Sequence, residues 1–201
     1  MSRNIVVFDF DHTIYKGDSS IDFYFFFLKK YPIYFVVLFY QFFFYCLFKL
    51  KLISVENFKS RYFVFLTVLD EKSRENLINE FWDARKSVHF NQNLMNTFDF
   101  FKSKEIDIVI ASASLYLILD AFKERHGIDL LIATEAEFSF KGLTIHENCR
   151  GIVKIRRLKE KYSDFTIVEA YSDNYDDSAL LRMAQKGYWV KGNHLILYNS
   201  N

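Results

Sequence analysis

The sequence predicts an α/β fold in which a mostly parallel sheet forms the core and a helical cap follows the first strand. Strand-like and helical segments alternate after residue 90, which is typical of a parallel sheet with right-handed crossovers. Residues 18–90 instead lack strand alternation and contain long helical stretches. We therefore expect a Rossmann-like core formed by residues 1–17 and 91–201, and a Phe-rich helical cap formed by residues 18–90.

The first strand is an apolar run over 6–8 that stops at an acidic residue. Later segments alternate between short apolar runs, typical of buried parallel strands, and longer helical stretches. Lys141-Gly142 suits the tight turn of a short hairpin. After the cap we expect a helix over 91–104, a strand over 106–111, a helix over 114–125, a strand over 130–133, a hairpin of 137–140 and 143–145, a helix over 152–162, a strand over 166–171, a helix over 177–185, and strands over 188–190 and 195–198.

Paired carboxylates end the first strand, at Asp9 and Asp11. Side chains two apart on a strand point the same way, and acids held this close repel unless a cation or a shared proton offsets them. The carboxyl ends of strands are also where open α/β sheets bind ligands. Alone, such a pair usually marks a solvated turn. Three later features strengthen the interpretation of this pair as a functional site: Ser112 after a second apolar strand, Lys154 in a basic helix, and an acidic cluster over 172–177.

Together these four elements resemble the haloacid dehalogenase superfamily of aspartate-nucleophile phosphohydrolases, and the resemblance covers nearly the whole chain. The motifs of that family are Asp-x-Asp-x-Thr, a Ser or Thr that ends a strand, a Lys, and an acidic pair. They match, in the same order, Asp9, Asp11 and Thr13, then Ser112, then Lys154, then Asp173 and Asp177.

The resemblance implies a catalytic role for each acid. Asp9 would attack phosphorus to form an aspartyl-phosphate, and Asp11 would protonate the leaving oxygen and then deprotonate the attacking water. A magnesium ion would be held by the Asp9 carboxylate, the main-chain carbonyl of Asp11 and the Asp173 carboxylate, with Asp177 supporting its water shell. The expected cofactor is therefore Mg²⁺, and the expected partner is a phosphate ester.

The resemblance also implies that Lys154, Ser112 and Thr13 bind the substrate, with Lys154 bridging the nucleophile and a phosphoryl oxygen. Each has a structural alternative. A lysine in a basic amphipathic stretch is ordinarily exposed, and Ser112 is also a candidate helix N-cap, with Ser114 as a competitor. Asp176 lies in the acidic cluster but does not align with the motif.

The cap is unusually aromatic, since thirteen of the 24 phenylalanines fall between Phe23 and Phe65. Residues 33–48 are almost continuously apolar, with Gln41 as the single strongly polar member. A helix that is apolar on every face must be buried in protein or in lipid. The lysines that flank it are Lys29, Lys30, Lys49 and Lys51.

Sixteen helical residues reach roughly 24 Å, less than the ~30 Å hydrocarbon core of a bilayer. Topology excludes a single span, because Asp9 before the segment and Lys154 after it must meet in one site. We therefore expect residues 21–50 to form a helical hairpin that contacts the membrane peripherally. The alternative is that these aromatics form a dry cap core or a homodimer interface.

Within the superfamily, the early helical cap looks like subclass IB, the branch of phosphoserine phosphatase and phosphatidylglycerophosphatase C. Phosphoserine enzymes usually carry a Glu where this chain has Asp18, so amino-acid specificity is not implied. The lysine-flanked cap favours a membrane lipid phosphate such as phosphatidylglycerophosphate. A soluble small-metabolite phosphatase, acting on a phosphoserine-like or sugar-phosphate-like substrate and dimerising through the cap, and a non-catalytic binding module remain alternatives.

Charge, cysteine spacing and the start of the chain narrow the expected binding partners and cellular compartment. The net charge of +1 gives no general attraction to nucleic acid. Cys46 and Cys149 are far apart and match no metal or redox spacing, which favours a reducing compartment. The chain enters its first strand without a signal-peptide pattern. We expect a cytoplasmic enzyme associated with the inner face of the membrane.

Overall fold

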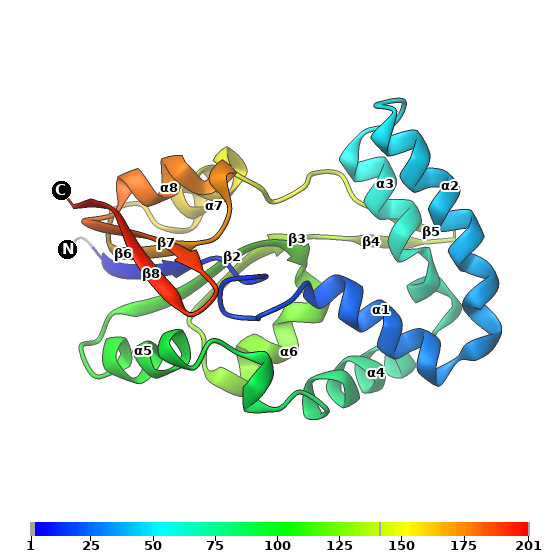
Figure 1. Cartoon of the computed structure of the whole chain (residues 1–201), viewed down its shortest axis with the longest axis horizontal. Helices are drawn as coiled ribbons and strands as arrows, with labels where there is room; N and C mark the ends of the chain where they lie inside the picture. The colour runs from blue at the N-terminus through cyan, green and yellow to red at the C-terminus, as the bar shows by residue number, and fades with distance from the viewer. Residues whose placement is uncertain (1–2, 141, 201) are drawn as a thin grey trace.

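The computed structural model describes residues 3–140 and 142–200, and a six-stranded sheet forms its core (Figure 1). The strands of this sheet are β1 (Arg3–Phe8), β2 (Asp107–Leu115), β3 (Leu130–Thr134), β6 (Phe165–Ser172), β7 (Lys186–Lys191) and β8 (His194–Ser200). Their order is β3-β2-β1-β6-β7-β8. All neighbouring strands pair in parallel except β8, which is antiparallel to β7 at one edge. The predicted α/β class with a mostly parallel sheet is confirmed.

Strand β1 lies inside the sheet and is buried on both faces, which explains its continuous apolar run. Ile5 and Val7 belong to one hydrophobic cluster, with α7 (Ile152–Lys161) and α8 (Ser178–Met183). Val6 and Phe8 belong to another, with α5 (Gln92–Lys102) and α6 (Tyr116–His126). The two pairs of helices cover opposite faces of the sheet (Figure 1). This sandwich fixes the end of β1, where the paired carboxylates follow.

Residues 19–89 form helices and 3₁₀ turns joined by short loops. The helices are α1 (Ser19–Lys30), α2 (Val37–Lys49), α3 (Val55–Tyr62) and α4 (Glu71–Asp83), with 3₁₀ turns η1 (Pro32–Val36), η2 (Phe63–Val68) and η3 (Ser87–His89). Side chains cap three of them: Asp18, Ser54 and Asp70 each accept a hydrogen bond from a backbone N–H in the first turn. Pro32 opens η1, and its ring prevents α1 from continuing.

The second strand is longer than the sequence predicts. β2 continues to Leu115, which still pairs with Thr134 of β3 after an irregularity in register. Ser112 and Ser114 therefore lie in the strand, and α6 begins only at Tyr116. The turn η4 (Tyr175–Asp177) likewise occupies the start of the predicted helix over 177–185.

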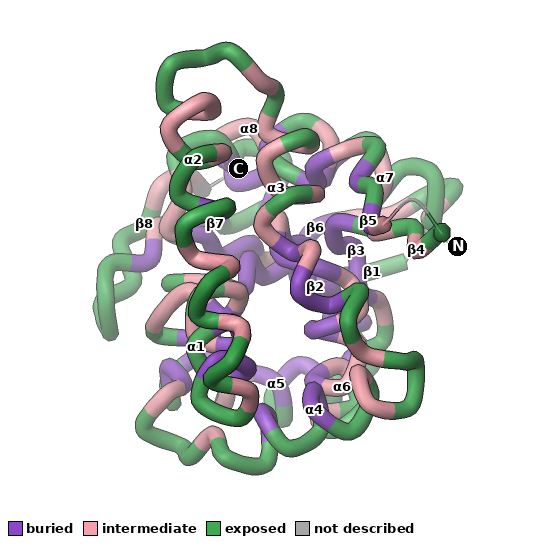
Figure 2. Tube along the Cα trace, turned by 90° about the vertical axis from the view of Figure 1, so that its right-hand side faces the viewer, coloured by how far each residue is buried: buried purple, intermediate pink, exposed green. Residues whose placement is uncertain are grey.

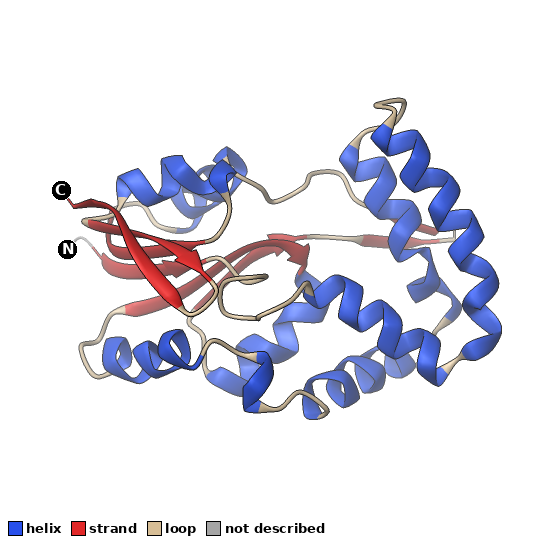
Figure 3. Cartoon of the chain, viewed as in Figure 1, coloured by secondary structure: helices blue, strands red, loops and turns tan. Residues whose placement is uncertain are grey.

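A hairpin of β4 (Glu137–Ser139) and β5 (Gly142–Thr144) leaves the main sheet and packs against the cap (Figure 3). The Ile145 backbone N–H donates to Ser60 Oγ of α3 at 2.9 Å. The Arg74 guanidinium lies 4.2 Å from the centroid of the Phe138 ring. The sequence analysis placed this hairpin with the core, and in the structure β5 packs against α3 and η2 of the cap. Lys141, in the predicted turn, lies outside the described residues.

The cap and the core share one hydrophobic interior. Phe23, Phe27 and Phe65 are buried in a cluster that continues to the helices beneath the sheet. Trp82 of α4 connects the two parts, since its Nε1–H donates to the Ile118 carbonyl at 2.7 Å and its ring lies 5.9 Å from that of Phe10. A cap of this size is stable because it does not need an interior of its own.

Helix α2 is the exception to this burial. It lies on the outer side of the cap, and most of its length is exposed or half-buried (Figure 2). Gln41 alone in this helix is buried, and its Nε2 donates to the Tyr62 carbonyl at 2.6 Å. Phe39 is 81% exposed. A dry cap core therefore accounts for Phe23, Tyr24 and Phe27 of α1 and for the aromatics of η2, but not for the outer face of α2.

We predict that two phenylalanines of the cap differ sharply in their contribution to stability. Phe65→Ala should lower the free energy of unfolding by about 3–5 kcal/mol, because this buried ring packs against Phe23, Tyr24 and Phe27. Phe39→Ala should change it by less than about 0.5 kcal/mol, since little contact is lost. Urea denaturation of both variants and of the wild type measures these changes in the free energy of unfolding. Equal losses would show that protein covers the face of α2.

Candidate active site

Asp9 is held at the carboxyl end of β1 by backbone and side-chain contacts. Its backbone N–H donates to the Tyr171 carbonyl at 2.8 Å, which extends the pairing with β6. Its Oδ1 accepts hydrogen bonds from Phe10 N at 2.8 Å and Lys154 Nζ at 2.9 Å. Asp9 is only 7% exposed, so its carboxylate has one orientation and one open approach, from the cavity that it lines.

Lys154, in the first turn of α7, is 2% exposed and lies between two carboxylates. Its Nζ is 2.9 Å from Asp9 Oδ1 and 2.6 Å from Asp177 Oδ2. Burial by itself lowers the pKa of Lys154, but the charges of Asp9 and Asp177 outweigh it and raise the pKa above its ordinary value. The side chain is therefore a fixed cation beside the Asp9 carboxylate.

Asp177 is buried and contacts two polar side chains of the site through one carboxylate oxygen. Its Oδ2 contacts Lys154, and it also lies 2.7 Å from the Ser172 hydroxyl, which is 3.2 Å from Asp9 Oδ2. Burial raises the pKa of Asp177, although Lys154 opposes this. Asp177 Oδ1 has no hydrogen-bond partner within residues 3–140 and 142–200. The sequence placed Asp177 in the metal site; here its carboxylate is used to hold Lys154 and Ser172.

Asp173 lines the cavity and is held by Thr13. The Asp173 backbone N–H donates to Thr13 Oγ1 at 3.0 Å, and the Thr13 hydroxyl lies 3.4 Å from Asp173 Oδ1. Burial and then the charge of Asp9 raise the pKa of Asp173 to about 6. Thr13 is buried and is not part of the cavity lining. The structure therefore makes Thr13 a support for Asp173, whereas the sequence predicted a substrate contact.

A magnesium ion fits the oxygen atoms that remain. Among the described residues no three His, Cys, Asp or Glu side chains converge in a way that could hold a metal. Asp9, Asp11 and Asp173 nevertheless line the same cavity, and the two carboxylates of Asp9 and Asp173 with the main-chain carbonyl of Asp11 are the residues that would hold Mg²⁺, an ion that prefers hard oxygen ligands and keeps several waters. The charge of Asp9 that raises the pKa of Asp173 is a negative charge that a divalent cation would offset.

Asp11 is held as a candidate proton donor. Its Oδ1 accepts from the Ser19 backbone N–H at 2.7 Å, and the Ser114 hydroxyl donates to its Oδ2. Burial and then the charge of Asp18 raise the pKa of Asp11 to about 6, which suits an acid that works near neutral pH. The hydroxyl of Ser112 accepts from Ser114 N at 3.0 Å, so its own proton can point into the cavity.

These side chains meet in one cavity of about 430 Å³. The core supplies its polar wall, and five residues predicted from sequence contribute to it: Asp9, Asp11, Ser112, Lys154 and Asp173. The cap supplies an apolar wall, formed by Ile21, Tyr45, Phe58, Tyr62 and Phe63. The cavity therefore matches a ligand with a charged group and an apolar body.

Two further cations line this cavity, and the sequence gave no signal for either. Lys59 of α3 donates from Nζ to the Ala113 carbonyl at 2.7 Å and to Asn148 Oδ1 at 2.5 Å. Burial lowers its pKa to about 8. Arg150 pairs with Asp176, with 2.5 Å between Nε and Oδ2. In sequence, Lys59 resembles any lysine of a polar helix face; only the packing of α3 brings it to β2.

Gly151 allows the two loops that carry the ion pair to approach each other. Its φ is +55°, and a Cβ there would lie 3.1 Å from the Asp176 carbonyl oxygen. A residue with a side chain would be strained at this φ, and its Cβ would require the Asp176 backbone to shift by a few tenths of an ångström.

Comparison with known proteins agrees with this geometry. The family model described as haloacid dehalogenase-like hydrolase matches residues 6–182. Protein CicA of Caulobacter vibrioides (strain NA1000 / CB15N) is 35% identical over 95 residues, which cover 44% of this chain and 43% of CicA. The chain thus matches less than half the length of that relative.

Two solved structures share the fold at low identity. A protein of unknown function from Bordetella pertussis Tohama I superimposes with a TM-score of 0.79 at 16% identity, covering 93% of this chain and 89% of its own. A phosphoserine phosphohydrolase-like protein from Francisella tularensis subsp. tularensis SCHU S4 gives 0.57 at 20% identity, covering 93% and 86%. The predicted superfamily is confirmed by the family model, and the predicted fold by these structures. The chain belongs to the haloacid dehalogenase-like hydrolases.

Proposed function

We propose that this protein is a magnesium-dependent phosphomonoester hydrolase that works through an aspartyl-phosphate on Asp9, and that it acts on a membrane lipid phosphate such as phosphatidylglycerophosphate. The observation that carries the chemistry is the buried contact of 2.9 Å between Lys154 and Asp9 at the end of the central strand. A carboxylate can approach a phosphate dianion only where cations offset the accumulated charge. Lys154 supplies one such cation, and bound magnesium would supply the rest.

Asp9, Asp11, Ser112 and Lys154 have different roles in the proposed reaction. An Asp9 oxygen forms a bond to phosphorus while the bond from phosphorus to the leaving oxygen breaks, and Asp11 gives that oxygen a proton. Asp11 then takes a proton from a water that attacks phosphorus, which releases phosphate and restores Asp9. Ser112 and Lys154 donate to the non-bridging oxygens throughout.

The lipid substrate is supported by the apolar wall of the cavity, where cap aromatics such as Phe58 and Tyr62 surround the space next to the acids. An amino-acid substrate gains little from that wall. Asp18, at the position where phosphoserine enzymes carry a Glu, uses its Oδ1 to accept from Ile21 N at 3.0 Å as the N-cap of α1. One oxygen of Asp18 therefore caps the helix, although the residue also lines the cavity.

A substrate panel tests the proposed function. The purified protein, with magnesium, is given an aryl phosphate, phosphoserine, a sugar phosphate and a lipid phosphate in mixed micelles. We expect the lipid phosphate to have the highest kcat/KM. A preference for phosphoserine or a sugar phosphate would favour the soluble-metabolite enzyme, and no turnover of any of them would favour a binding module.

We predict that Asp9→Asn lowers kcat for an aryl phosphate at least about 10³-fold, because the amide keeps the shape of the side chain but is not a nucleophile. Circular dichroism should show an unchanged fold. Asp99→Asn is the matched control, since Asp99 is exposed on α5 and does not line the cavity. Its kcat should stay near that of the wild type. Substantial turnover by Asp9→Asn would refute the nucleophile assignment.

We predict that magnesium stabilises the wild-type protein and does not stabilise Asp173→Asn. The cation would relieve the repulsion between Asp9 and Asp173 and bind only the folded state, which raises the melting temperature. The measurement is a thermal melt at pH 7.5 with increasing magnesium, so it does not depend on turnover. An equal rise in both proteins would remove Asp173 from the metal site.

We predict that Asp11 makes the protein less stable as pH rises from about 4 to 6.5. Its folded pKa is about 6 against an ordinary value of 3.8, so the folded state binds more protons across this window. The stabilisation is complete below the ordinary pKa and is lost as pH rises through the folded pKa, by about 3 kcal/mol in total. The Asp11→Asn side chain cannot titrate. The free energy of unfolding of this variant, measured in urea with a chelator, should therefore fall less steeply with rising pH than that of the wild type. Asp99→Asn, exposed on α5, should keep the wild-type slope.

A further inference from the structure

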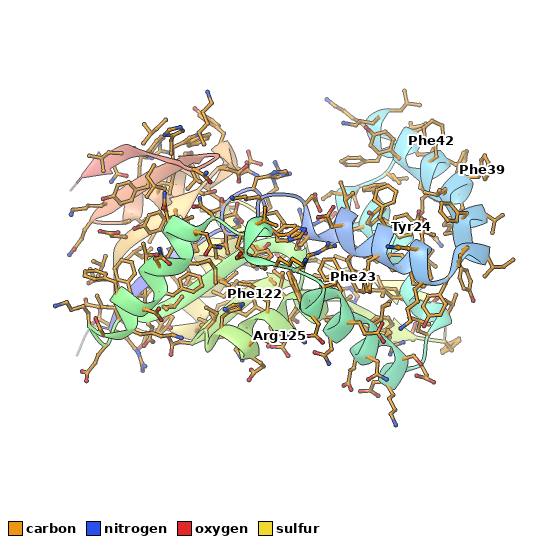
Figure 4. The ribbon with its side chains drawn as sticks, turned by 60° about the horizontal axis from the view of Figure 1, so that its bottom comes forward. Phe23, Tyr24, Phe39, Phe42, Phe122 and Arg125 are labelled. Carbon is orange, nitrogen blue, oxygen red and sulfur yellow. The ribbon has the colours of Figure 1, made fainter. Side chains whose placement is uncertain are left out.

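The outer face of α2 carries large apolar side chains that contact little protein. Val36 is 68% exposed, Phe39 81%, Phe42 66% and Phe43 57%. Spacings of three and four residues place them on one side of the helix. Phe39 and Phe42 lie on the outer side of the cap, away from Phe23 and Tyr24 (Figure 4). This face is too apolar to be ordinary solvent-exposed surface.

Within the described residues, Pro32–Lys49 is the one helical segment whose length and composition would allow it to cross a membrane, and it is 6% buried. It does not stand free as a span requires, because its inner side packs on α3. The Arg61 guanidinium lies 5.3 Å from the Phe44 ring centroid and donates to Tyr40 Oη at 3.2 Å. One long side of the helix is held by protein and the other is open, which is the arrangement of a helix that lies in an interface.

The charged residues of the α2 segment and its flanks have one sign, and one of them, Lys30, is paired with Glu80 of α4 at 2.5 Å. The sequence has no Asp or Glu between Asp22 and Glu56, and its lysines in this stretch stand at the two ends of the apolar segment. Lys29 and Lys49 are exposed, and Lys49 Nζ lies 5.4 Å from the Tyr45 ring centroid. A basic border around an apolar face is complementary to a surface that is apolar inside and anionic outside.

A second copy of the chain does not supply that surface. A two-fold dimer would pair this face with itself, so its lysines would meet the lysines of the partner. The stretch contains no carboxylate to neutralise them. An anionic bilayer offers both acyl chains for the phenylalanines and negative headgroups for the lysines.

The face is continuous with the active site. Tyr45 is 43% exposed on α2 and also lines the catalytic cavity with Phe58. A lipid whose chains remain in the bilayer would therefore meet the cavity at its apolar wall. We infer that the outer face of α2 docks this enzyme on a bilayer containing anionic lipids, which gives the phosphatase proposed above its membrane partner and rests on that function.

Co-sedimentation with lipid vesicles tests the inference. Wild-type protein should pellet with vesicles of equal phosphatidylcholine and phosphatidylglycerol, and added salt should weaken the binding. Vesicles of phosphatidylcholine alone should bind much less. Protein that stays in the supernatant with both vesicles, or that binds both equally, overturns the proposal.

A triple variant identifies the face. Phe39→Ser, Phe42→Ser and Phe43→Ser together should weaken binding to the anionic vesicles at least about 100-fold. Turnover of a soluble aryl phosphate should be unchanged, and hydrolysis of lipid phosphate in vesicles should fall. The control changes three equally exposed apolar residues on other surfaces, Val88→Ser, Phe100→Ser and Ile196→Ser, and should bind as the wild type does. Equal binding by both triple variants contradicts the inference.

A charge variant keeps the test independent of any folding defect in the triple variant. Lys29→Gln with Lys49→Gln should weaken binding about fivefold for each lysine and reduce its dependence on salt. Unchanged affinity overturns the charge argument.

Analytical ultracentrifugation without lipid tests whether a second copy of the chain occupies this face. If the wild type is a dimer and the triple variant Phe39→Ser, Phe42→Ser and Phe43→Ser is a monomer, the face belongs to a second copy. Loss of aryl phosphatase activity in the wild type would refute the proposed function, yet vesicle binding would remain measurable.

Discussion

A buried lysine between two carboxylates determines the arrangement of this active site. Lys154 contacts Asp9 and Asp177, and removing either acid would leave a desolvated charge without its partner. One lysine does not neutralise this cluster, because Asp173 adds a third carboxylate whose pKa is raised by burial and by the charge of Asp9. The remaining negative charge suits a metal cation, and the cation and lysine together suit a phosphate. The loops at Gly151 and η4 must therefore approach closely for the chemistry to exist.

The cap is tied to the core by the groups that line the site. Asp11 accepts from the first backbone N–H of α1, at Ser19, and its other oxygen accepts from Ser114 of β2. Lys59 of α3 reaches the Ala113 carbonyl in the same strand. The proton affinity of Asp11 therefore depends on where α1 begins, and the position of the cap depends on polar contacts inside the cavity. In this fold the cap is part of the catalytic environment.

The phenylalanines of the cap have two distinct environments. Phe23 and Phe27 of α1 and Phe63 and Phe65 of η2 join the interior that runs through Trp82 to Phe10, so hydrophobic burial stabilises the cap on the core. Those on the outer side of α2 remain exposed. Since burial of an aromatic side chain is favourable wherever it occurs, the exposed set retains the capacity to bind an apolar surface.

The sequence by itself determined the parallel core and the position of the helical segment, because side-chain alternation and the shared carboxyl edge of parallel strands are local rules. The meeting of Asp9, Asp11, Ser112, Lys154 and Asp173 followed from the order of motifs that resembles the family. Tertiary structure decided which partners the other side chains of the site and the hairpin contact. Thr13 and Asp177 turn toward protein partners, Lys59 enters the cavity from the cap, and the 137–144 hairpin packs on α3. Contacts between segments far apart in the chain set these outcomes, and no local pattern records which distant segment will supply the partner.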